Sequence, residues 1–271
     1  MLLAGFFKYA VPDDRKANKT KIMIEIKLSD NLKLLKSQPD ESVDLIYSDI
    51  LYGTGRNFGE YQDLKPKRDV IESHYLPRLI EMKRVLKQNG SIYLQMDTRI
   101  NHWMRILMDK VFGYDNFLNE IVFAYSGGGI SKRHYPRKHD VILFYSKSGK
   151  HYFSNEKKPY SDMSSKNLLW KHRNKKRIEE LNNGTPITDV WTDLKFKINY
   201  QEKEFTGYPT QKPKELIKRF VLASSNEGDV VADYYLGSGT TAEVCKELNR
   251  NFIGCDISER AIEITKQRLS D

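Results

Sequence analysis

A glycine-rich turn near the C-terminus carries residue types that suit a nucleoside-containing ligand. The segment 233–241 (DYYLGSGTT) directly follows a short apolar run. Glycines after a strand let the backbone approach a ligand closely, and the free amides of the next helix can bind its polar groups. The following apolar run ends at Asp256, where a carboxylate suits the two hydroxyls of a ribose. No lysine follows the last glycine, so the segment is not a phosphate-binding P-loop. A purely structural glycine turn is the alternative.

A second turn, at 48–55 (SDILYGTG), also follows a strand-like run. The carboxylate of Asp49 could accept a hydrogen bond from an amino group, and the ring of Tyr52 could stack on a flat base. Gly53, Gly55 and Gly59 then indicate a mobile loop able to close over a substrate. Taken alone, this segment is also typical of a capped turn that leads into a helix.

The elements around these turns alternate between strand and helix. Apolar periodicity predicts strands at 22–28, 43–47, 91–96, 120–125, 141–145, 229–234 and 251–255. It predicts helices at 71–86, 100–111, 240–248 and 258–269, the first stopped by Asn89-Gly90 and the second by Gly113. Such alternation indicates an α/β fold, in which helices cover both faces of a parallel sheet.

Composition excludes several other classes of protein. The chain has 271 residues, 39% of them hydrophobic and 11% aromatic, which is enough apolar surface for a core. No apolar run approaches the ~20 residues that span a bilayer, and the first residues lack the features of a signal peptide. Cys245 and Cys255 are too few for a disulfide scaffold or a four-cysteine zinc site. The six histidines are scattered, so no metal site is expected. We therefore expect a soluble cytoplasmic protein.

The excess of positive charge favours a polyanionic partner. Lys and Arg number 45 against 36 Asp and Glu, a net charge of +9, and nucleic acid is the commonest cellular polyanion. The helical rhythm fades between residues 151 and 206, where eight basic residues stand against four acidic ones from 156 to 180. An inserted subdomain is one interpretation of this stretch, and a solvated helix face is the other.

Taken together, these segments resemble a known family. Asp49-Ile50-Leu51-Tyr52 is similar to the Asp-Pro-Pro-Tyr motif of amino-group DNA methyltransferases, and 233–241 is similar to their S-adenosylmethionine motif. Segment 208–213 (YPTQKP) resembles the stretch that precedes the cofactor strand, and 138–145 and 189–191 resemble further segments. The order, with the catalytic motif first and the cofactor motif last, is that of the β class found in bacterial restriction-modification systems. Unlike most members, this chain has Ile50 and Leu51 in place of the two prolines and Tyr234 after the cofactor-motif aspartate.

The resemblance implies a permuted Rossmann-like methyltransferase fold with a mostly parallel sheet. Its divisions would be an N-terminal extension (1–21), a catalytic half (22–150), a basic target-recognition region (151–206) and a cofactor-binding half (207–271). The cofactor would be S-adenosylmethionine without a metal, and the substrate would be double-stranded DNA. A cognate restriction endonuclease and a second copy of the chain are partners that the resemblance leaves open.

The resemblance also assigns roles to individual residues. The catalytic residues would be Asp49, the main-chain carbonyl of Ile50, and Tyr52, which stacks on a base flipped out of the duplex. The cofactor would be held by Asp30, Gln211, Lys212, Asp233, Gly237, Ser238, Gly239, Thr240, Thr241 and Asp256. DNA would be contacted by Lys171, Arg173, Lys175, Lys176 and Arg177.

The position of Asp49 favours adenine N6 as the methylated atom. Enzymes of this class that act on cytosine N4 more often have serine there, and cytosine N4 is the alternative. A DNA-binding relative with weak or no catalysis and a methyltransferase of RNA or protein are the other readings left open.

Overall fold

The computed structural model describes residues 8–9, 22–125, 130–154, 156–158, 184–194, 198 and 200–270, to which every structural statement below refers. Strands form one nine-stranded sheet in the order β1-β2-β11-β10-β3-β4-β6-β5-β9. Their bounds are β1 Lys8–Tyr9, β2 Ile24–Leu28, β3 Val43–Asp49, β4 Leu86–Asp97, β5 Phe117–Ala124, β6 His139–Ser146, β9 Val190–Trp191, β10 Val230–Asp233 and β11 Asn251–Asp256.

The centre of this sheet is parallel, and antiparallel pairs lie toward both of its edges. Strands β2, β11, β10, β3 and β4 run parallel to their neighbours. Strand β6 is antiparallel to both β4 and β5, and β1 adds an antiparallel strand at the opposite edge. The predicted parallel sheet is therefore confirmed for the strands that carry the two glycine-containing turns.

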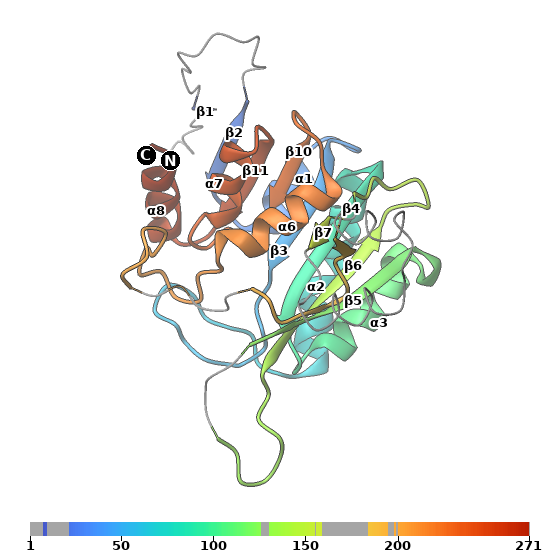
Figure 1. Ribbon diagram of the computed structural model, residues 1–271, viewed down its shortest axis with the longest axis vertical. Coiled ribbons are helices and arrows are strands. Elements are labelled where there is room, and N and C mark those ends of the chain that lie inside the picture. Colours follow the sequence, from blue (N-terminus) through green and yellow to red (C-terminus); the bar gives the residue numbers. More distant parts are fainter. Residues whose placement is uncertain are drawn as a thin grey trace, which may run out of the picture.

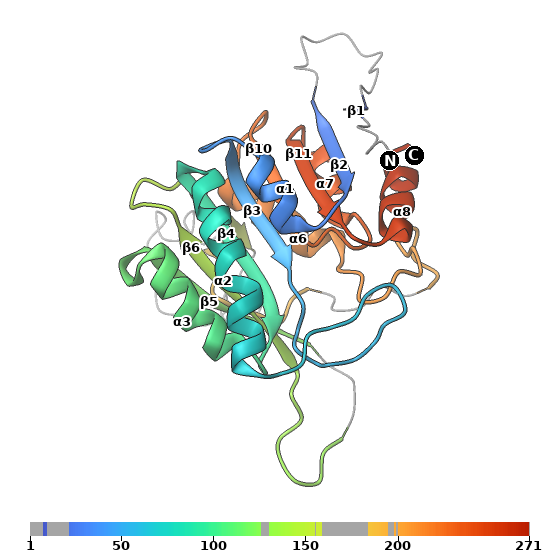
Figure 2. The same cartoon turned by 180° about the vertical axis from the view of Figure 1, so that it is seen from behind.

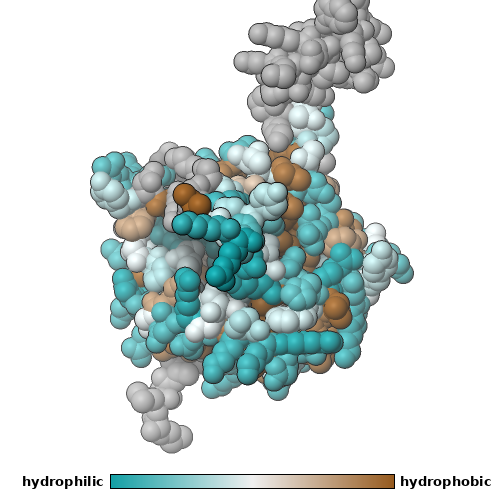
Figure 3. Space-filling view, turned by 90° about the horizontal axis from the view of Figure 1, so that it is seen from below, coloured by the Kyte–Doolittle hydropathy of each residue, from teal (hydrophilic) through white to brown (hydrophobic). Residues whose placement is uncertain are grey.

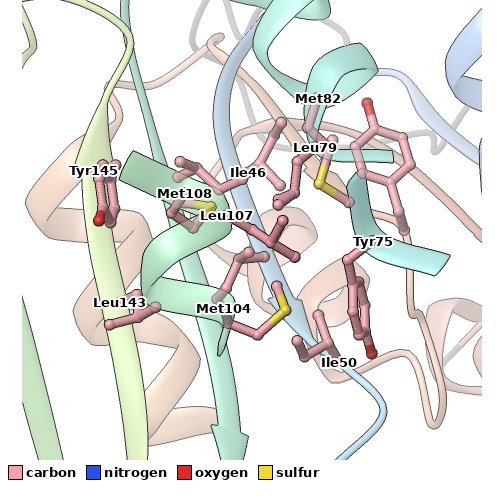
Figure 4. Packing of buried hydrophobic residues seen from close by; sticks show 14 of the residues in the cluster. Ile46, Ile50, Tyr75, Leu79, Met82, Met104, Leu107, Met108, Leu143 and Tyr145 are labelled. Atoms are coloured by element: carbon pink, nitrogen blue, oxygen red, sulfur yellow. The ribbon is translucent and has the colours of Figure 1, made fainter. Parts of the chain in front are cut away.

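Helices cover both faces of the sheet, as the alternating pattern predicts (Figures 1 and 2). One face carries α1 (Asn31–Ser37), α2 (Arg68–Val85) and α3 (Asn101–Phe112), with a short 3₁₀ turn η1 (Tyr114–Asn116) after α3. The other carries α6 (Lys214–Ser224), α7 (Thr240–Glu247) and α8 (Glu259–Ser270). Each layer buries its own apolar cluster against the sheet. In Figure 4, Met104 and Leu107 of α3 and Leu79 of α2 pack around Ile46 of β3.

The strand order brings four carboxylates to one edge of the sheet. Asp49, Asp233 and Asp256 end the neighbouring strands β3, β10 and β11, and Asp30 lies just beyond the end of β2. Because these four strands are parallel, their carboxyl ends meet at the same edge, where α/β proteins bind ligands. The fold thus places the two turns side by side.

The helix stop predicted at Asn89-Gly90 is wrong. The helix predicted at 71–86 ends at Val85, and β4 begins at Leu86 rather than at residue 91, because Leu86 is extended (φ −64°, ψ 137°) and already pairs with Val43 of β3. Gly90 lies inside β4, where a Cβ would stand 2.9 Å from the carbonyl oxygen of Asp44. Its sequence signal therefore reflects a close approach of two strands and not the end of a helix.

The region assigned to target recognition is partly tied to the main sheet. Strand β9, at 190–191, pairs in parallel with β5, so this end of the region belongs to the sheet and not to a separate insertion. Strands β7 (Lys157–Lys158) and β8 (Thr185–Pro186) form a small antiparallel pair. Residues 159–183 lie outside the described part of the chain.

Candidate active site

A cleft runs along the carboxyl edge of the central strands and unites both turns. It encloses about 1150 Å³ of empty space, including space open to solvent. Of the residues predicted from sequence, the cleft is lined by Asp30, Asp49, Ile50, Tyr52, Gln211, Lys212, Asp233, Gly237, Ser238, Thr240, Thr241 and Asp256. Two segments more than 180 residues apart in the sequence therefore form one site.

The buried carboxylate of Asp233 links the two turns through hydrogen bonds. Its carboxylate accepts hydrogen bonds from the hydroxyl of Thr241 (2.7 Å), the amide of Tyr235 (3.0 Å) and the hydroxyl of Ser48 in the other turn (3.2 Å). Burial raises the pKa of Asp233 to about 7. Because both carboxylate oxygens are engaged by the protein, Asp233 supports the shape of the site.

The carboxylate of Asp256 is held at the mouth of the glycine turn. It accepts hydrogen bonds from the amides of Gly237 and Ser258, each at 2.9 Å. Burial raises the pKa of Asp256. Gly237 adopts a left-handed conformation (φ 52°), which glycine reaches without steric cost.

Gly239 is the one predicted cofactor residue that does not line the cleft. It caps the start of α7 with φ 74°, and a Cβ there would stand 2.3 Å from the hydroxyl oxygen of Thr265 on α8. Gly239 therefore lets α7 and α8 pack closely. The sequence motif does not distinguish this packing glycine from a glycine that contacts a ligand.

Lys212 lies at the catalytic end of the cleft, paired with Asp49. The Lys212 ammonium is 2.8 Å from Asp49 Oδ2, and only 9% of the lysine side chain and 19% of the aspartate side chain are exposed. Burial raises the pKa of Asp49, and the charge of Lys212 opposes that rise. The sequence assigns Lys212 to the cofactor, and in the structure Lys212 both lines the cleft and pairs with Asp49, the predicted catalytic carboxylate.

Tyr52 bridges two carboxylates. Its hydroxyl lies 2.7 Å from Asp49 Oδ1 and 2.8 Å from Asp140 Oδ2. A phenol has a single hydrogen to donate, so it serves one carboxylate fully at a time. Asp140 is buried and also accepts a hydrogen bond from the side chain of Gln95 at 2.8 Å.

Sequence reasoning missed Asp140 as a site residue, although its segment figured in the family resemblance. The only local signal is a carboxylate at the start of a strand that is otherwise apolar. A buried charge in that position costs free energy unless it is paired, which identifies it as a candidate for a site.

Packing fixes the turn that follows β3, where the family that the sequence resembles usually has prolines. The amide of Ile50 donates to the carbonyl of Gln95 (3.1 Å), and the hydroxyl of Tyr75 donates to the carbonyl of Leu51 (2.9 Å). The side chain of Ile50 is 3% exposed and lies in the core close to Tyr75 and Met104 (Figure 4). These contacts restrain the turn in place of the fixed φ of proline.

The glycine-containing loop after Tyr52 is braced by a buried carboxylate. Asp63 is 3% exposed and accepts hydrogen bonds from the amides of Gly53 (3.1 Å) and Thr54 (2.7 Å). From the same loop, the hydroxyl of Tyr61 lies 3.4 Å from that of Thr210. The loop therefore spans from the catalytic turn to the segment that precedes α6. Asp63 carries no motif, and the sequence did not single it out.

Asp30 and Gln211 line the cleft, and each also makes hydrogen bonds that hold neighbouring segments in place. Asp30 caps α1 through the amide of Lys33 and pairs with Arg78 at 3.0 Å. The side-chain oxygen of Gln211 accepts a hydrogen bond from the backbone amide of Thr206 (2.9 Å).

The five basic residues predicted to contact DNA lie outside the described residues: Lys171, Arg173, Lys175, Lys176 and Arg177.

The comparison with protein families accounts for most of the chain. The family model described as DNA methylase, which covers N6 and N4 enzymes, matches residues 43–267. The chain belongs to this family. The match spans both turns and helices from both faces of the sheet, and it leaves out α1.

Relatives of this methylase are similar along most of their length. It is 35% identical to the Type II methyltransferase M.HpaI of Haemophilus parainfluenzae, covering 89% of this chain and 72% of the relative. It is 33% identical to the DNA adenine methyltransferase YhdJ of Escherichia coli, covering 94% of this chain and 84% of the relative.

Solved structures show the same fold. The cytosine-N4-specific PvuII DNA methyltransferase matches 92% of this methylase and 86% of its own chain, with a TM-score of 0.66 and 16% identity. The complex of M1.HpyAVI with S-adenosylmethionine matches 92% of this chain and 100% of its own, with a TM-score of 0.62 and 19% identity. The permuted methyltransferase fold expected from the sequence is confirmed, and the family depends on S-adenosylmethionine. Within the described residues, no helix is both long and apolar enough to cross a membrane.

Proposed function

We propose that this methylase transfers a methyl group to N6 of adenine in double-stranded DNA, and that the carboxylate of Asp49 accepts a hydrogen bond from the target amine. The observation that carries the proposal is the position of Asp49. It ends β3, lies beside the glycine turn and shares its own turn with Tyr52. The name of the relative YhdJ, a DNA adenine methyltransferase, supports the choice of base.

The residues of the cleft fit the proposed cofactor. S-adenosylmethionine supplies an electrophilic methyl group on a positively charged sulfur. The carboxylate of Asp256 suits ribose hydroxyls, since it stands at the end of β11 beside the Gly237 turn. Asp30, on the neighbouring strand end, suits the adenosine part, and Thr240 and Thr241 begin the helix behind the turn.

Asp49 and its neighbour act on the amine. The amino nitrogen of adenine has its lone pair drawn into the ring and is a poor nucleophile. If the Asp49 carboxylate and the carbonyl of Ile50 accept hydrogen bonds from its two N–H groups, the nitrogen moves toward tetrahedral geometry and its lone pair becomes available. The nitrogen–carbon bond would then form as the bond from the methyl carbon to sulfur breaks, with the electron pair left on sulfur and one amine proton released to solvent. Fixed acceptors of this kind reduce the barrier by alignment and electrostatics.

The ion pair with Lys212 keeps the acceptor charged. Buried carboxylates tend to become protonated, and a protonated Asp49 would offer one acceptor fewer. The Lys212 ammonium at 2.8 Å opposes that tendency. Both Asp49 oxygens already have protein donors, Lys212 and Tyr52. Since a carboxylate oxygen can accept two hydrogen bonds, the amine either joins these donors or displaces one of them.

Tyr52 is the donor that yields in this proposal. Its hydroxyl has a second carboxylate within reach, at Asp140, so it can release Asp49 without losing its hydrogen bond. Its ring then lies beside the entering base, on which it can stack after the base has left the duplex.

Methyl transfer by variants tests the assignment. Asp49→Ala should abolish transfer of labelled methyl groups to duplex DNA while leaving cofactor binding intact in calorimetry. Asp115→Ala, an exposed aspartate in η1, is the matched control and should be active. Near-full activity of Asp49→Ala would overturn the assignment. Asp256→Ala should weaken cofactor binding severalfold or more, and unchanged affinity would move the cofactor elsewhere.

The basic region at 151–206 completes the proposal as the part that contacts phosphate. Its charge would make the logarithm of the affinity for DNA fall linearly with the logarithm of salt concentration. Comparable affinity for structured RNA would argue against DNA as the substrate. Several relatives are named Type II methyltransferases, and a cognate restriction endonuclease is the partner that we expect for this chain in the bacterial cytoplasm.

A further inference from the structure

Residues 130–138, which lead into β6, project from the end of the molecule that carries the cleft. In Figures 1 and 2 they extend below the body of the protein, beyond the ends of the strands. The register pairs Ala124 with His139 at the base of this hairpin. The amide of Tyr125 donates to the carbonyl of Lys138 at 2.9 Å and closes it. The described part of the loop comprises residues 130–138.

The loop is rooted next to the reacting groups. Asp140, the second residue of β6, holds the hydroxyl of Tyr52. Tyr135 is five residues before Asp140, so an extended chain places it up to ~17 Å away. That reach exceeds the ~8.5 Å depth of the major groove of DNA. A duplex that presents a base to Tyr52 therefore comes within range of the loop.

The charge of the loop matches that of DNA. Between residues 130 and 139 the sequence has four basic residues and no acidic one: Lys132, Arg133, Arg137 and Lys138. Figure 3 looks onto this end of the molecule, where hydrophilic residues cover most of the surface. The predicted DNA contacts in the target-recognition region do not include this loop.

Two large apolar side chains stand fully out of the loop. Ile130 is 94% exposed and Tyr135 is 95% exposed, the highest values among the large hydrophobic residues described. The hydroxyl of Ser131 accepts hydrogen bonds from the amides of Arg133 and His134 at 3.3 Å and gives the intervening turn a defined shape. Exposed apolar groups on a basic element are the pattern of proteins that insert a side chain between base steps.

From these observations we propose that loop 130–138 is a DNA-inserting element, in which Tyr135 enters the duplex and occupies the space that the flipped base leaves. The inference rests on the proposed function, because it requires a base that leaves the stack. The ring of Tyr135 replaces the stacking lost by the neighbours of the target base, while the basic residues on either side hold the adjacent phosphates.

The test uses two synthetic duplexes that carry a methylation site mapped with the wild-type enzyme. In one, the target base is normally paired, and in the other an abasic position stands opposite it, which lowers the cost of flipping. Tyr135→Ala should reduce the rate of methyl transfer at least tenfold on the paired duplex and less than threefold on the abasic one. A loss of fold or of general DNA affinity would reduce both rates equally.

Tyr114→Ala is the matched control, because Tyr114 is 71% exposed and lies before β5, at the other end of the sheet. Equal rates for Tyr135→Ala and Tyr114→Ala, or equal losses on the two duplexes, would overturn the inference while the wild-type activity still supports the proposed function. If the wild type methylates neither duplex nor genomic DNA, the proposed function itself fails.

A second measurement addresses the charge and needs no catalysis. The measurement plots the logarithm of the affinity for a fluorescent duplex against the logarithm of salt concentration. In the double variant Arg133→Ala, Arg137→Ala, the slope of this line should be smaller in magnitude by about 1 to 2, if each arginine contacts one phosphate. An unchanged slope would show that the loop does not touch the DNA backbone.

Discussion

Replacing Lys212 by methionine isolates the contribution of the buried ion pair at the catalytic turn. Methionine keeps much of the apolar stem and removes the ammonium that lies 2.8 Å from Asp49 Oδ2. The carboxylate is then left in a buried site, with Asp140 as a second negative charge beyond Tyr52. We expect a large loss of stability, together with a rise in the pKa of Asp49.

The magnitude follows from the geometry. At 2.8 Å and an effective dielectric constant of ~20, two unit charges attract by about 6 kcal/mol, part of which desolvation offsets. Removal of one member of a buried pair typically costs about 3–5 kcal/mol. In a domain of this size, each kcal/mol lowers the melting temperature by roughly 2–4 °C, so Lys212→Met should melt roughly 10 °C below the wild type.

The assay is a double-mutant cycle measured by urea unfolding. It compares the wild type, Lys212→Met, Asp49→Asn and the double variant, with Lys110→Met on the exposed side of α3 as a control. Because the double variant removes both partners of the Lys212–Asp49 pair, and Asp140, 3.9 Å from the ammonium, loses Lys212 in both Lys212 variants, its loss should be smaller than the sum of the single losses by at least about 1–2 kcal/mol. A cost of less than ~1 kcal/mol for Lys212→Met, or additive losses, would refute the ion pair as the support of Asp49.

Three further outcomes are expected. The pKa of Asp233 is about 7 in the folded protein. Between its ordinary pKa and that value, Asp233 is protonated when the protein is folded and ionised when it is unfolded. Its contribution to the free energy of unfolding should therefore fall by up to about 4 kcal/mol from pH 4 to 7. Asp233→Asn should flatten that fall in urea titrations, and an unchanged pH profile would contradict it. Tyr52→Phe removes only the hydroxyl that bridges Asp49 and Asp140 and leaves the predicted cofactor residues unchanged, so it should retain cofactor affinity and lower stability by about 1–3 kcal/mol; a stability equal to that of the wild type would count against the bridge. Gly239→Ala should destabilise more than Gly59→Ala in thermal melts, because both have positive φ but only the first meets Thr265, and equal losses would be inconsistent with the close packing of α7 on α8.

Local patterns in the sequence predict the parts of this fold that depend on neighbours along the chain. The run before Asp233 and the glycines after it form a strand, a turn and a helix as expected, because each is set by nearby residues. The order of the two motifs then predicts that Asp49 and Asp256 share a crevice, since parallel strands align their carboxyl ends.

Contacts between distant residues were not predictable in the same way. Lys212 and Asp49 are 163 residues apart, and no periodicity indicates that they pair. The sequence predicts that Gly90 ends a helix, whereas in the structure it lets β4 lie close to the backbone of β3. Asp63 carries no motif, and the family resemblance of segment 138–145 does not mark Asp140 as a site residue, so both acquire their roles only through the buried groups around them. Sequence patterns specify local shape, whereas burial in the folded chain decides which charges must be paired.

The most direct measurement is transfer of labelled methyl groups from S-adenosylmethionine to unmethylated duplex DNA, followed by nucleoside digestion and mass spectrometry. We expect N6-methyladenine from the wild type and none from Asp49→Ala. N4-methylcytosine would contradict the choice of base. Absence of any methylated nucleoside from the wild type, with cofactor binding intact, would contradict the proposed methyl transfer to DNA.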